Sequence, residues 1–120
     1  MTSSSQLPRY QKQMLLKEIG EQGQLLLSQA SVLVVGAGGL GCPALQYLAA
    51  AGIGRIGIVD FDVVEVSNLH RQILYTLEDV GLLKAKIAEK RVKALNPEVQ
   101  VEVFTEKLET KNALSIMERF

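Results

Sequence analysis

The stretch Val32-Leu33-Val34-Val35-Gly36-Ala37-Gly38-Gly39-Leu40-Gly41 decides the fold of this chain. Its first four residues are apolar and mostly β-branched, which predicts a buried strand. The residues that follow, 42–51, are rich in helix formers and carry Pro43 where a first helical turn tolerates proline. Strand, glycine turn and helix in this order are typical of a phosphate-binding crossover, because the backbone can approach a ligand closely and the helix start favours an anion. We therefore expect a nucleotide at these glycines, which are Gly36, Gly38, Gly39 and Gly41.

A second apolar strand is predicted over 55–59, and Asp60 follows it directly. An acidic residue about 20 positions beyond the glycines is where a ribose hydroxyl is usually accepted. Asp60 is therefore the predicted ribose ligand. The alternative is that its carboxylate only caps the loop that follows.

Composition limits the classes of function. With 120 residues, the chain is one domain at most and is short for a complete doubly wound enzyme. A formal net charge of zero argues against non-specific binding to nucleic acid or to a membrane surface. Cys42 is the single cysteine, so neither a disulfide nor a metal cluster within the chain is predicted. Neither a membrane-spanning run nor a secretory signal is evident, and we expect a cytoplasmic protein.

Periodicity and capping signals place the remaining elements, after a serine-rich segment over 1–8 that we expect to be disordered. The long polar stretch over 60–76 is predicted to be a loop, and Asn96-Pro97 is predicted to end a helix. The expected elements are helices over 10–19 and 24–30, a strand over 32–35, a helix over 40–51, a strand over 55–59, a helix from the capping box at 76–79 to about 95, a strand over 99–103 and a helix from 110.

These elements form a βαβαβ unit, which is one mononucleotide-binding half of a Rossmann-like, parallel α/β sheet preceded by short helices. Right-handed crossovers predict the spatial order third, second, first strand. The first strand then lies at an edge, although it is the most apolar of the three. We therefore expect either a longer protein or a partner to cover that edge.

The loop after the second strand indicates the class of nucleotide. It contains Asn68 and Arg71, and Lys84 follows near the next helix. A dinucleotide has two bridging phosphates that a glycine turn can largely satisfy, whereas a triphosphate usually demands Arg and Lys. The sequence therefore favours a nucleoside triphosphate. The alternatives are that Arg71 pairs with Asp62 or Glu65 and that Lys84 is one solvated lysine among several.

The glycine turn, Val59-Asp60-Phe61-Asp62 and Ser67-Asn68-Leu69-His70-Arg71-Gln72 together resemble the MoeB/ThiF/HesA family, the bacterial relatives of ubiquitin-activating enzymes. Arg9-Tyr10-Gln11-Lys12-Gln13 and Asn96-Pro97 also fit, so the resemblance covers nearly the whole chain. It implies that residues 9–120 are the N-terminal part of an ATP-binding adenylyltransferase domain. The chain is incomplete relative to that family.

The resemblance also implies roles for individual residues. Gly39 would lie against the nucleotide, and Asp60 would hold its ribose. Arg71 and Lys84 would contact the phosphates and serve catalysis. The other residues implied to line the nucleotide site are Asp62, Ser67, Asn68, Leu69 and His70, with Arg9 and Lys12 as weaker candidates for a site on the neighbouring subunit.

The reaction implied is adenylation. The C-terminal glycine carboxylate of a small ubiquitin-like sulfur-carrier protein would attack the α-phosphate of ATP, with Mg²⁺ helping to neutralise the leaving pyrophosphate. The resemblance further implies a homodimer, and it places the magnesium-binding aspartate and a possible zinc site beyond Phe120. The pathway stays open between molybdopterin, thiamine and related sulfur transfer.

Two alternatives remain. An NAD-dependent oxidoreductase would explain the glycines and Asp60, but it leaves Ser67 to Arg71 and Lys84 unexplained. A truncated chain that binds nucleotide or a partner subunit without turnover would explain the glycines and Asp60 as well as Ser67 to Arg71 and Lys84.

Overall fold

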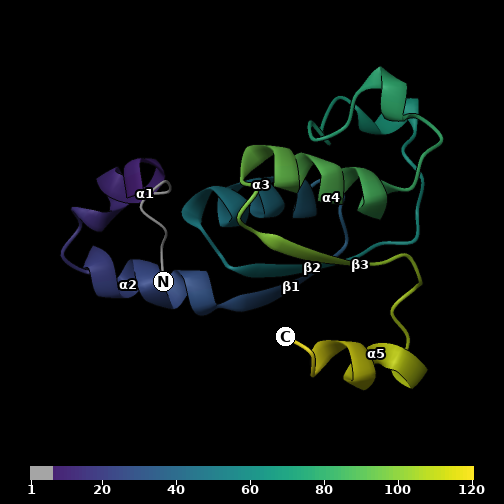
Figure 1. Ribbon diagram of the computed structural model, residues 1–120. Helices are drawn as coiled ribbons and strands as arrows, with labels where there is room; N and C mark the ends of the chain where they lie inside the picture. The colour runs from purple at the N-terminus through teal and green to yellow at the C-terminus, as the bar shows by residue number, and fades with distance from the viewer. Residues whose placement is uncertain (1–6) are drawn as a thin grey trace.

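A three-stranded parallel sheet forms the centre of the computed structural model, which describes residues 7–120 (Figure 1). The strands β1 (Ser31–Val35), β2 (Arg55–Val59) and β3 (Gln100–Phe104) lie side by side in that order. The predicted Rossmann-like topology and strand order are confirmed. Most of the segment expected to be disordered, residues 1–6, lies outside the described residues.

Two helices pack against one face of the sheet, the face that carries Val32 and Val34 of β1 and Ile56 and Ile58 of β2. The register pairs Val32 with Ile56 and Val34 with Ile58, so these side chains share one face. Helices α3 (Gly41–Ala51) and α4 (Lys84–Leu95) cover it (Figure 1). Because α3 and α4 also pack against each other, this layer holds most of the buried core.

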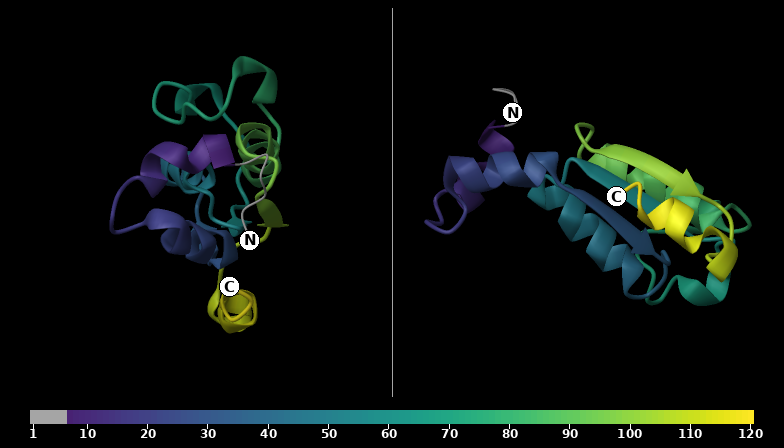
Figure 2. Two further views of the ribbon diagram at one scale, coloured as in Figure 1. Left: turned by 60° about the vertical axis from the view of Figure 1, so that its left-hand side comes forward. Right: turned by 90° about the horizontal axis from the view of Figure 1, so that it is seen from below.

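Helix α5 (Thr110–Met117) lies on the opposite face, as the two views in Figure 2 show. Phe120, just beyond it, occupies the space that a Cβ on Gly57 would need. The Arg55 guanidinium lies 4.2 Å from the centre of the Phe120 ring. Glu102 forms ion pairs with both Arg55 and Arg119. The chain end is therefore fastened to β2 and β3.

Two short helices precede β1 and differ in extent from the prediction. The helix expected over 10–19 is α1 (Leu7–Met14), and α2 (Gly20–Gln29) begins four residues before the predicted 24. The prediction of a single helix to residue 19 was wrong, because residues 15–19 form turns in which Leu15 and Leu16 remain exposed. Buried Asn96 donates to Tyr10 Oη at 2.7 Å and so ties α1 to the end of α4.

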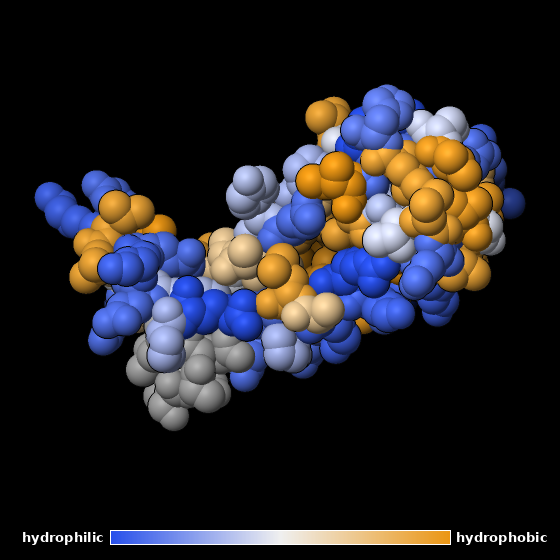
Figure 3. Space-filling view, turned by 90° about the horizontal axis from the view of Figure 1, so that it is seen from above, coloured by the Kyte–Doolittle hydropathy of each residue, from blue (hydrophilic) through white to orange (hydrophobic). Residues whose placement is uncertain are grey.

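The loop after β2 also departs from the prediction. The capping box at Thr76 and Asp79 is present, but it closes the short 3-10 turn η2 (Leu77–Asp79) instead of starting the long helix. Gly81 follows with φ +87°, a left-handed conformation that interrupts the helical path. Helix α4 therefore begins only at Lys84. Figure 3 shows apolar residues gathered over this loop.

Strand β1 lies at the edge of the sheet, and within residues 7–120 its outer side pairs with no other strand. Val35 is 57% exposed, and the other β1 residues are partly exposed. The edge position predicted for this strand is confirmed. In the same described range, no helix combines the length and the apolar character that crossing a lipid bilayer requires.

Candidate nucleotide-binding site

The carboxyl ends of β1 and β2 meet at Asp60. Its Oδ2 accepts a hydrogen bond of 2.8 Å from the Ala37 N–H, and its Oδ1 accepts one of 2.8 Å from the Asp62 N–H. Asp60 therefore holds the loop that follows it, as the alternative interpretation expects. Because a carboxylate offers about four lone-pair sites, each oxygen keeps one for a ribose hydroxyl. The two roles are compatible.

The glycine turn needs glycine at two positions for different reasons. Gly36 has φ +93°, which other residues rarely adopt, and its N–H donates to Val59 O at 2.7 Å. A Cβ on Gly41 would overlap the carbonyl oxygen of Gly36. The start of α3 is thereby brought close to the end of β1.

Four consecutive backbone N–H groups, those of residues 38–41, find no acceptor among residues 7–120. They belong to the turn and to the start of α3, which carries no acidic residue in its first turn. The dipole of α3 adds partial positive charge at the same end. Free amides and a helix start together form a binding site for an anion.

A cleft of about 440 Å³ opens in front of this turn. It brings together residues of the turn, of the end of β2, of the following loop and of the start of α4. Seven of the predicted site residues line it. These are Gly36, Gly38, Asp60, Asp62, Asn68, Arg71 and Lys84.

Two cations of the cleft carry no carboxylate partner within the described residues. Arg71 is exposed and forms no ion pair with Asp62 or Glu65, which was the alternative interpretation. Lys84 is only 6% exposed, so it is not a solvated lysine. Its backbone N–H donates to Asp62 O at 3.0 Å, which fixes the first turn of α4 at the cleft. A buried ammonium without a counter-ion favours binding of an anion here.

Asn68 has a structural role in addition to its place in the lining. Its Oδ1 accepts a hydrogen bond of 3.0 Å from the Glu65 N–H, and its carbonyl accepts hydrogen bonds from the Arg71 and Gln72 N–H groups. These bonds close the 3-10 turn η1 (Val66–Asn68) and the turn after it. Asn68 therefore fixes the backbone that carries Arg71.

The remaining predicted site residues lie outside the lining of the cleft. Gly39 and Gly41 belong to the turn itself. Ser67, Leu69 and His70 lie around η1, where a nitrogen of the His70 ring is 3.0 Å from Ser67 O. Arg9 and Lys12 lie on α1, and Arg9 donates to Leu95 O at the far end of α4 at 2.8 Å. This chain therefore does not bring Arg9 and Lys12 to its own cleft.

Three lining residues were missed by the sequence analysis: Val63, Glu65 and Gln72. Gln72 is 3% exposed, and its Oε1 is buried without a hydrogen-bond partner in the described part of the chain. Its place directly after Arg71 was the available signal. An unpaired amide oxygen beside a cleft is costly, and it favours a ligand that satisfies the side chain.

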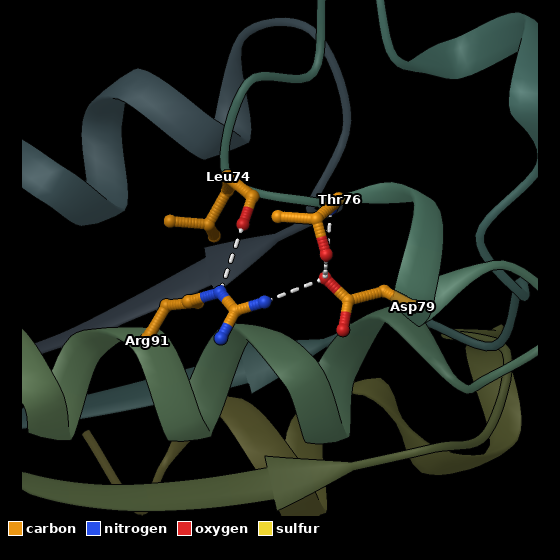
Figure 4. Close-up of polar contacts among 4 residues, drawn as sticks. All are labelled: Leu74, Thr76, Asp79 and Arg91. Atoms are coloured by element: carbon orange, nitrogen blue, oxygen red, sulfur yellow. Dashed lines mark hydrogen bonds and ion pairs between the residues drawn. The ribbon is translucent and has the colours of Figure 1, made fainter.

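A partly buried ion pair between Arg91 and Asp79 holds the loop of the cleft against α4 (Figure 4). Arg91 donates to Asp79 Oδ2 at 2.7 Å and to Leu74 O at 3.2 Å. The Thr76 N–H and hydroxyl donate to the same carboxylate oxygen. Burial alone would raise the pKa of Asp79, but these hydrogen bonds outweigh it and lower the pKa. The loop that carries Arg71 is thereby fixed relative to Lys84.

A second cavity, of about 430 Å³, lies at the amino ends of the three strands, beside the end of α2. Its two arginines, Arg55 and Arg119, are both paired with Glu102. Because their charge is already compensated, this cavity lacks the feature that distinguishes the cleft at the glycine turn.

The comparisons with known proteins identify the family. The family model described as the ThiF family matches residues 10–120. A sulfur carrier protein adenylyltransferase of Thermus thermophilus is 58% identical over 96% of this chain and 42% of its own length. A probable molybdopterin-synthase adenylyltransferase of Porphyra purpurea is 51% identical over 98% of this chain and 31% of its own length.

A solved structure shows the same fold. The tRNA N6-threonylcarbamoyladenosine dehydratase TcdA of E. coli, in complex with ATP, superimposes with a TM-score of 0.92 at 35% identity. It covers 98% of this chain and 48% of its own, so the chain spans less than half the length of these three proteins. With the glycine turn, the cleft and the family match in agreement, the chain belongs to the ThiF family.

Proposed function

We propose that this chain forms the ATP-binding part of an enzyme that adenylates the C-terminal carboxylate of a small sulfur-carrier protein. The observation that carries the proposal is that Arg71, buried Lys84 and four backbone N–H groups without an acceptor among residues 7–120 lie at one cleft. The names of the relatives, which are adenylyltransferases, and the ATP bound to TcdA support it. Residues 9–120 then constitute the nucleotide-binding portion of the domain.

Adenylation asks for positioning and charge neutralisation. The carrier carboxylate attacks the α-phosphorus, the bond to the bridging oxygen breaks, and pyrophosphate leaves. A carboxylate nucleophile needs no general base, so the enzyme has to align the reactants and stabilise the charge that builds on the leaving group. The glycine turn would hold the phosphates, Asp60 the ribose, and Arg71 and Lys84 the developing charge.

Mg²⁺ would supply further neutralisation of the phosphates. This ion is commonly bound by one or two carboxylates together with substrate phosphates. Asp62 lines the cleft, and the described residues form no cluster of three or more acidic, histidine or cysteine ligands. Asp62 would therefore bind a magnesium ion together with the nucleotide and with the aspartate that the resemblance places beyond Phe120.

The quaternary arrangement completes the proposal. Arg9 and Lys12 lie away from the cleft of their own chain, on exposed positions of α1. In a homodimer, Arg9 and Lys12 would contact the nucleotide bound to the neighbouring subunit. The enzyme would be cytoplasmic, and its substrate would be a protein and not a nucleic acid. The identity of the carrier protein determines which pathway the enzyme serves: molybdopterin synthesis, thiamine synthesis or another sulfur transfer.

Two measurements on the natural full-length protein test the proposal. Exchange of labelled pyrophosphate into ATP should occur and should depend on the carrier protein. Binding of NADH, measured by its fluorescence, should not be detected. This measurement tests the alternative of an NAD-dependent oxidoreductase, which would not explain the two cations of the cleft. Nucleotide binding without carrier-dependent exchange would instead identify a chain that binds but does not turn over.

Variants of the two cations test the assignment of the site. Arg71→Ala and Lys84→Ala should each lower the exchange rate at least tenfold, which corresponds to about 1.4 kcal/mol in the transition state. Lys90→Ala is the matched control, since Lys90 is exposed on the same helix as Lys84 and does not line the cleft. Unchanged exchange in both Arg71→Ala and Lys84→Ala would refute the site.

A further inference from the structure

The peptide that follows Ala37 is held from the inside of the protein. The Tyr75 hydroxyl donates to Ala37 O at 2.7 Å, and the Cys42 thiol lies 3.4 Å from the same oxygen. Both side chains are buried, and neither lines the cleft. Ala37 itself is fully buried, so its carbonyl is turned away from solvent.

In a trans peptide, the direction of the Ala37 carbonyl fixes the direction of the Gly38 N–H. The C=O of Ala37 and the N–H of Gly38 belong to one peptide unit and point in opposite directions. The described residues contain no cis peptide. With the Ala37 carbonyl directed at Tyr75, the Gly38 N–H faces the other way, and Gly38 lines the cleft. Its N–H is one of the four without an acceptor.

We propose that Tyr75 is a positioning residue for the polyphosphate, because its hydroxyl, assisted by the Cys42 thiol, holds the Ala37 carbonyl inward and aims the Gly38 N–H at the bound anion. This inference rests on the proposed ATP-binding function and deepens it. Asp60 fixes the preceding peptide through the Ala37 N–H, so the peptides on both sides of Ala37 are held by side chains.

The turn needs such an anchor because its residues have little intrinsic preference for one conformation. Gly36, Gly38 and Gly39 lack side chains, and glycine has the widest choice of backbone angles. A free turn would present its amides in many directions, and ordering them would reduce the affinity for the anion. The anchor is also insensitive to pH near neutrality, because burial raises the pKa of Tyr75 and of Cys42 and both groups keep their protons.

Tyr75→Phe tests the hydroxyl while preserving the packing of the ring. Tyr10→Phe is the matched control, because Tyr10 is also a buried tyrosine whose oxygen takes part in a hydrogen bond of 2.7 Å, with Asn96, but it lies away from the cleft. Each substitution is made in the natural full-length protein, and the dissociation constants of ATP and of adenosine are measured by competition with a fluorescent nucleotide. Adenosine has no phosphate, so it reports on the rest of the site.

Tyr75→Phe should weaken ATP binding roughly fivefold, the effect of one lost hydrogen bond, and leave adenosine binding within about twofold. Tyr10→Phe should change neither constant by more than about twofold. If the wild-type protein binds ATP, two results for Tyr75→Phe would overturn this inference but leave the proposed function standing. One is an equal loss of affinity for ATP and adenosine, and the other is unchanged ATP binding. A wild-type protein that binds no ATP would overturn the proposed function as well. Should Tyr75→Phe fail to fold, Cys42→Ala carries the test: ATP binding should weaken by more than about twofold, while adenosine binding should stay within about twofold.

Discussion

The carboxylate of Asp60 accepts a hydrogen bond of 2.8 Å from the backbone N–H of Ala37, and this contact joins the glycine turn to the end of β2. The other carboxylate oxygen accepts the Asp62 N–H. Asp60 therefore supports the site from within, whether or not a ribose is bound. Two structural hydrogen bonds converge on the side chain that the sequence predicts as a ribose ligand, with capping of the loop as the alternative.

Asp60→Asn tests this double role. The amide can accept only one of the two backbone N–H groups, and a hydrogen bond to a charged group contributes about 1.5–3 kcal/mol. The free energy of unfolding should therefore fall by about 2 kcal/mol in urea titrations without any nucleotide. Asp62→Asn is the control and should change stability by less than about 0.5 kcal/mol. Equal stabilities for Asp60→Asn and the wild type would show that these bonds contribute nothing.

A pair of glycine variants separates folding from binding. A Cβ on Gly41 would overlap backbone at Gly36, whereas a Cβ on Gly39 meets nothing within 4 Å. Gly41→Ala should therefore lower the free energy of unfolding by at least about 2 kcal/mol, as overpacking does. Gly39→Ala should fold with normal stability but bind ATP at least tenfold more weakly, since the resemblance implies that Gly39 lies against the nucleotide. Normal ATP affinity in Gly39→Ala would contradict the proposed place of the ligand.

The ion pair of Asp79 and Arg91 predicts a dependence of stability on pH. Because the pKa of Asp79 is lowered in the folded chain, its contribution is present above the unfolded value of about 3.9 and is lost as the pH falls through the folded value. Asp79→Asn should therefore be less stable than the wild type by about 2 kcal/mol at pH 7. Below about pH 4 the difference should shrink.

Urea titrations at pH 7, 5, 4 and 3 measure this difference. Glu78→Gln is the control, because the neighbouring Glu78 is exposed and outside the network. A difference between Asp79→Asn and the wild type that stays constant down to pH 3 would assign the effect to packing instead of charge.

The sheet and much of the cleft could be predicted because their signals are local. The apolar run at 32–35 and the glycines after it specify a strand, a turn and a helix within one short stretch. The loop was harder, because a capping box marks the start of any helical turn and not its length. The signal at Thr76 was correct, yet Gly81 interrupts the helix, so α4 begins at Lys84.

The supporting contacts could not be predicted, because they join residues far apart in the chain. Tyr75 donates to Ala37, which lies 38 positions earlier, and periodicity gives no indication of that pair. The burial of Lys84 is likewise a property of the packed loop, although its residue type and position predicted a role at the cleft. Sequence therefore predicts which side chains line the cleft better than it predicts which side chains hold them in place.

The open edge of β1 predicts self-association of the isolated 120-residue chain. An unpaired apolar edge strand offers backbone hydrogen-bonding groups to a second copy. Val35 is 57% exposed at the end of this strand. In sedimentation velocity runs, the chain should form dimers or larger species, and Val35→Lys should shift it toward monomer because a charge at a strand edge opposes pairing. Leu114→Lys is the matched control, since Leu114 is also apolar and is 78% exposed, but it lies on α5. A monodisperse monomer of the unmodified chain would show that this edge is protected by other means, and an equal effect of both lysines would assign association to general apolar exposure.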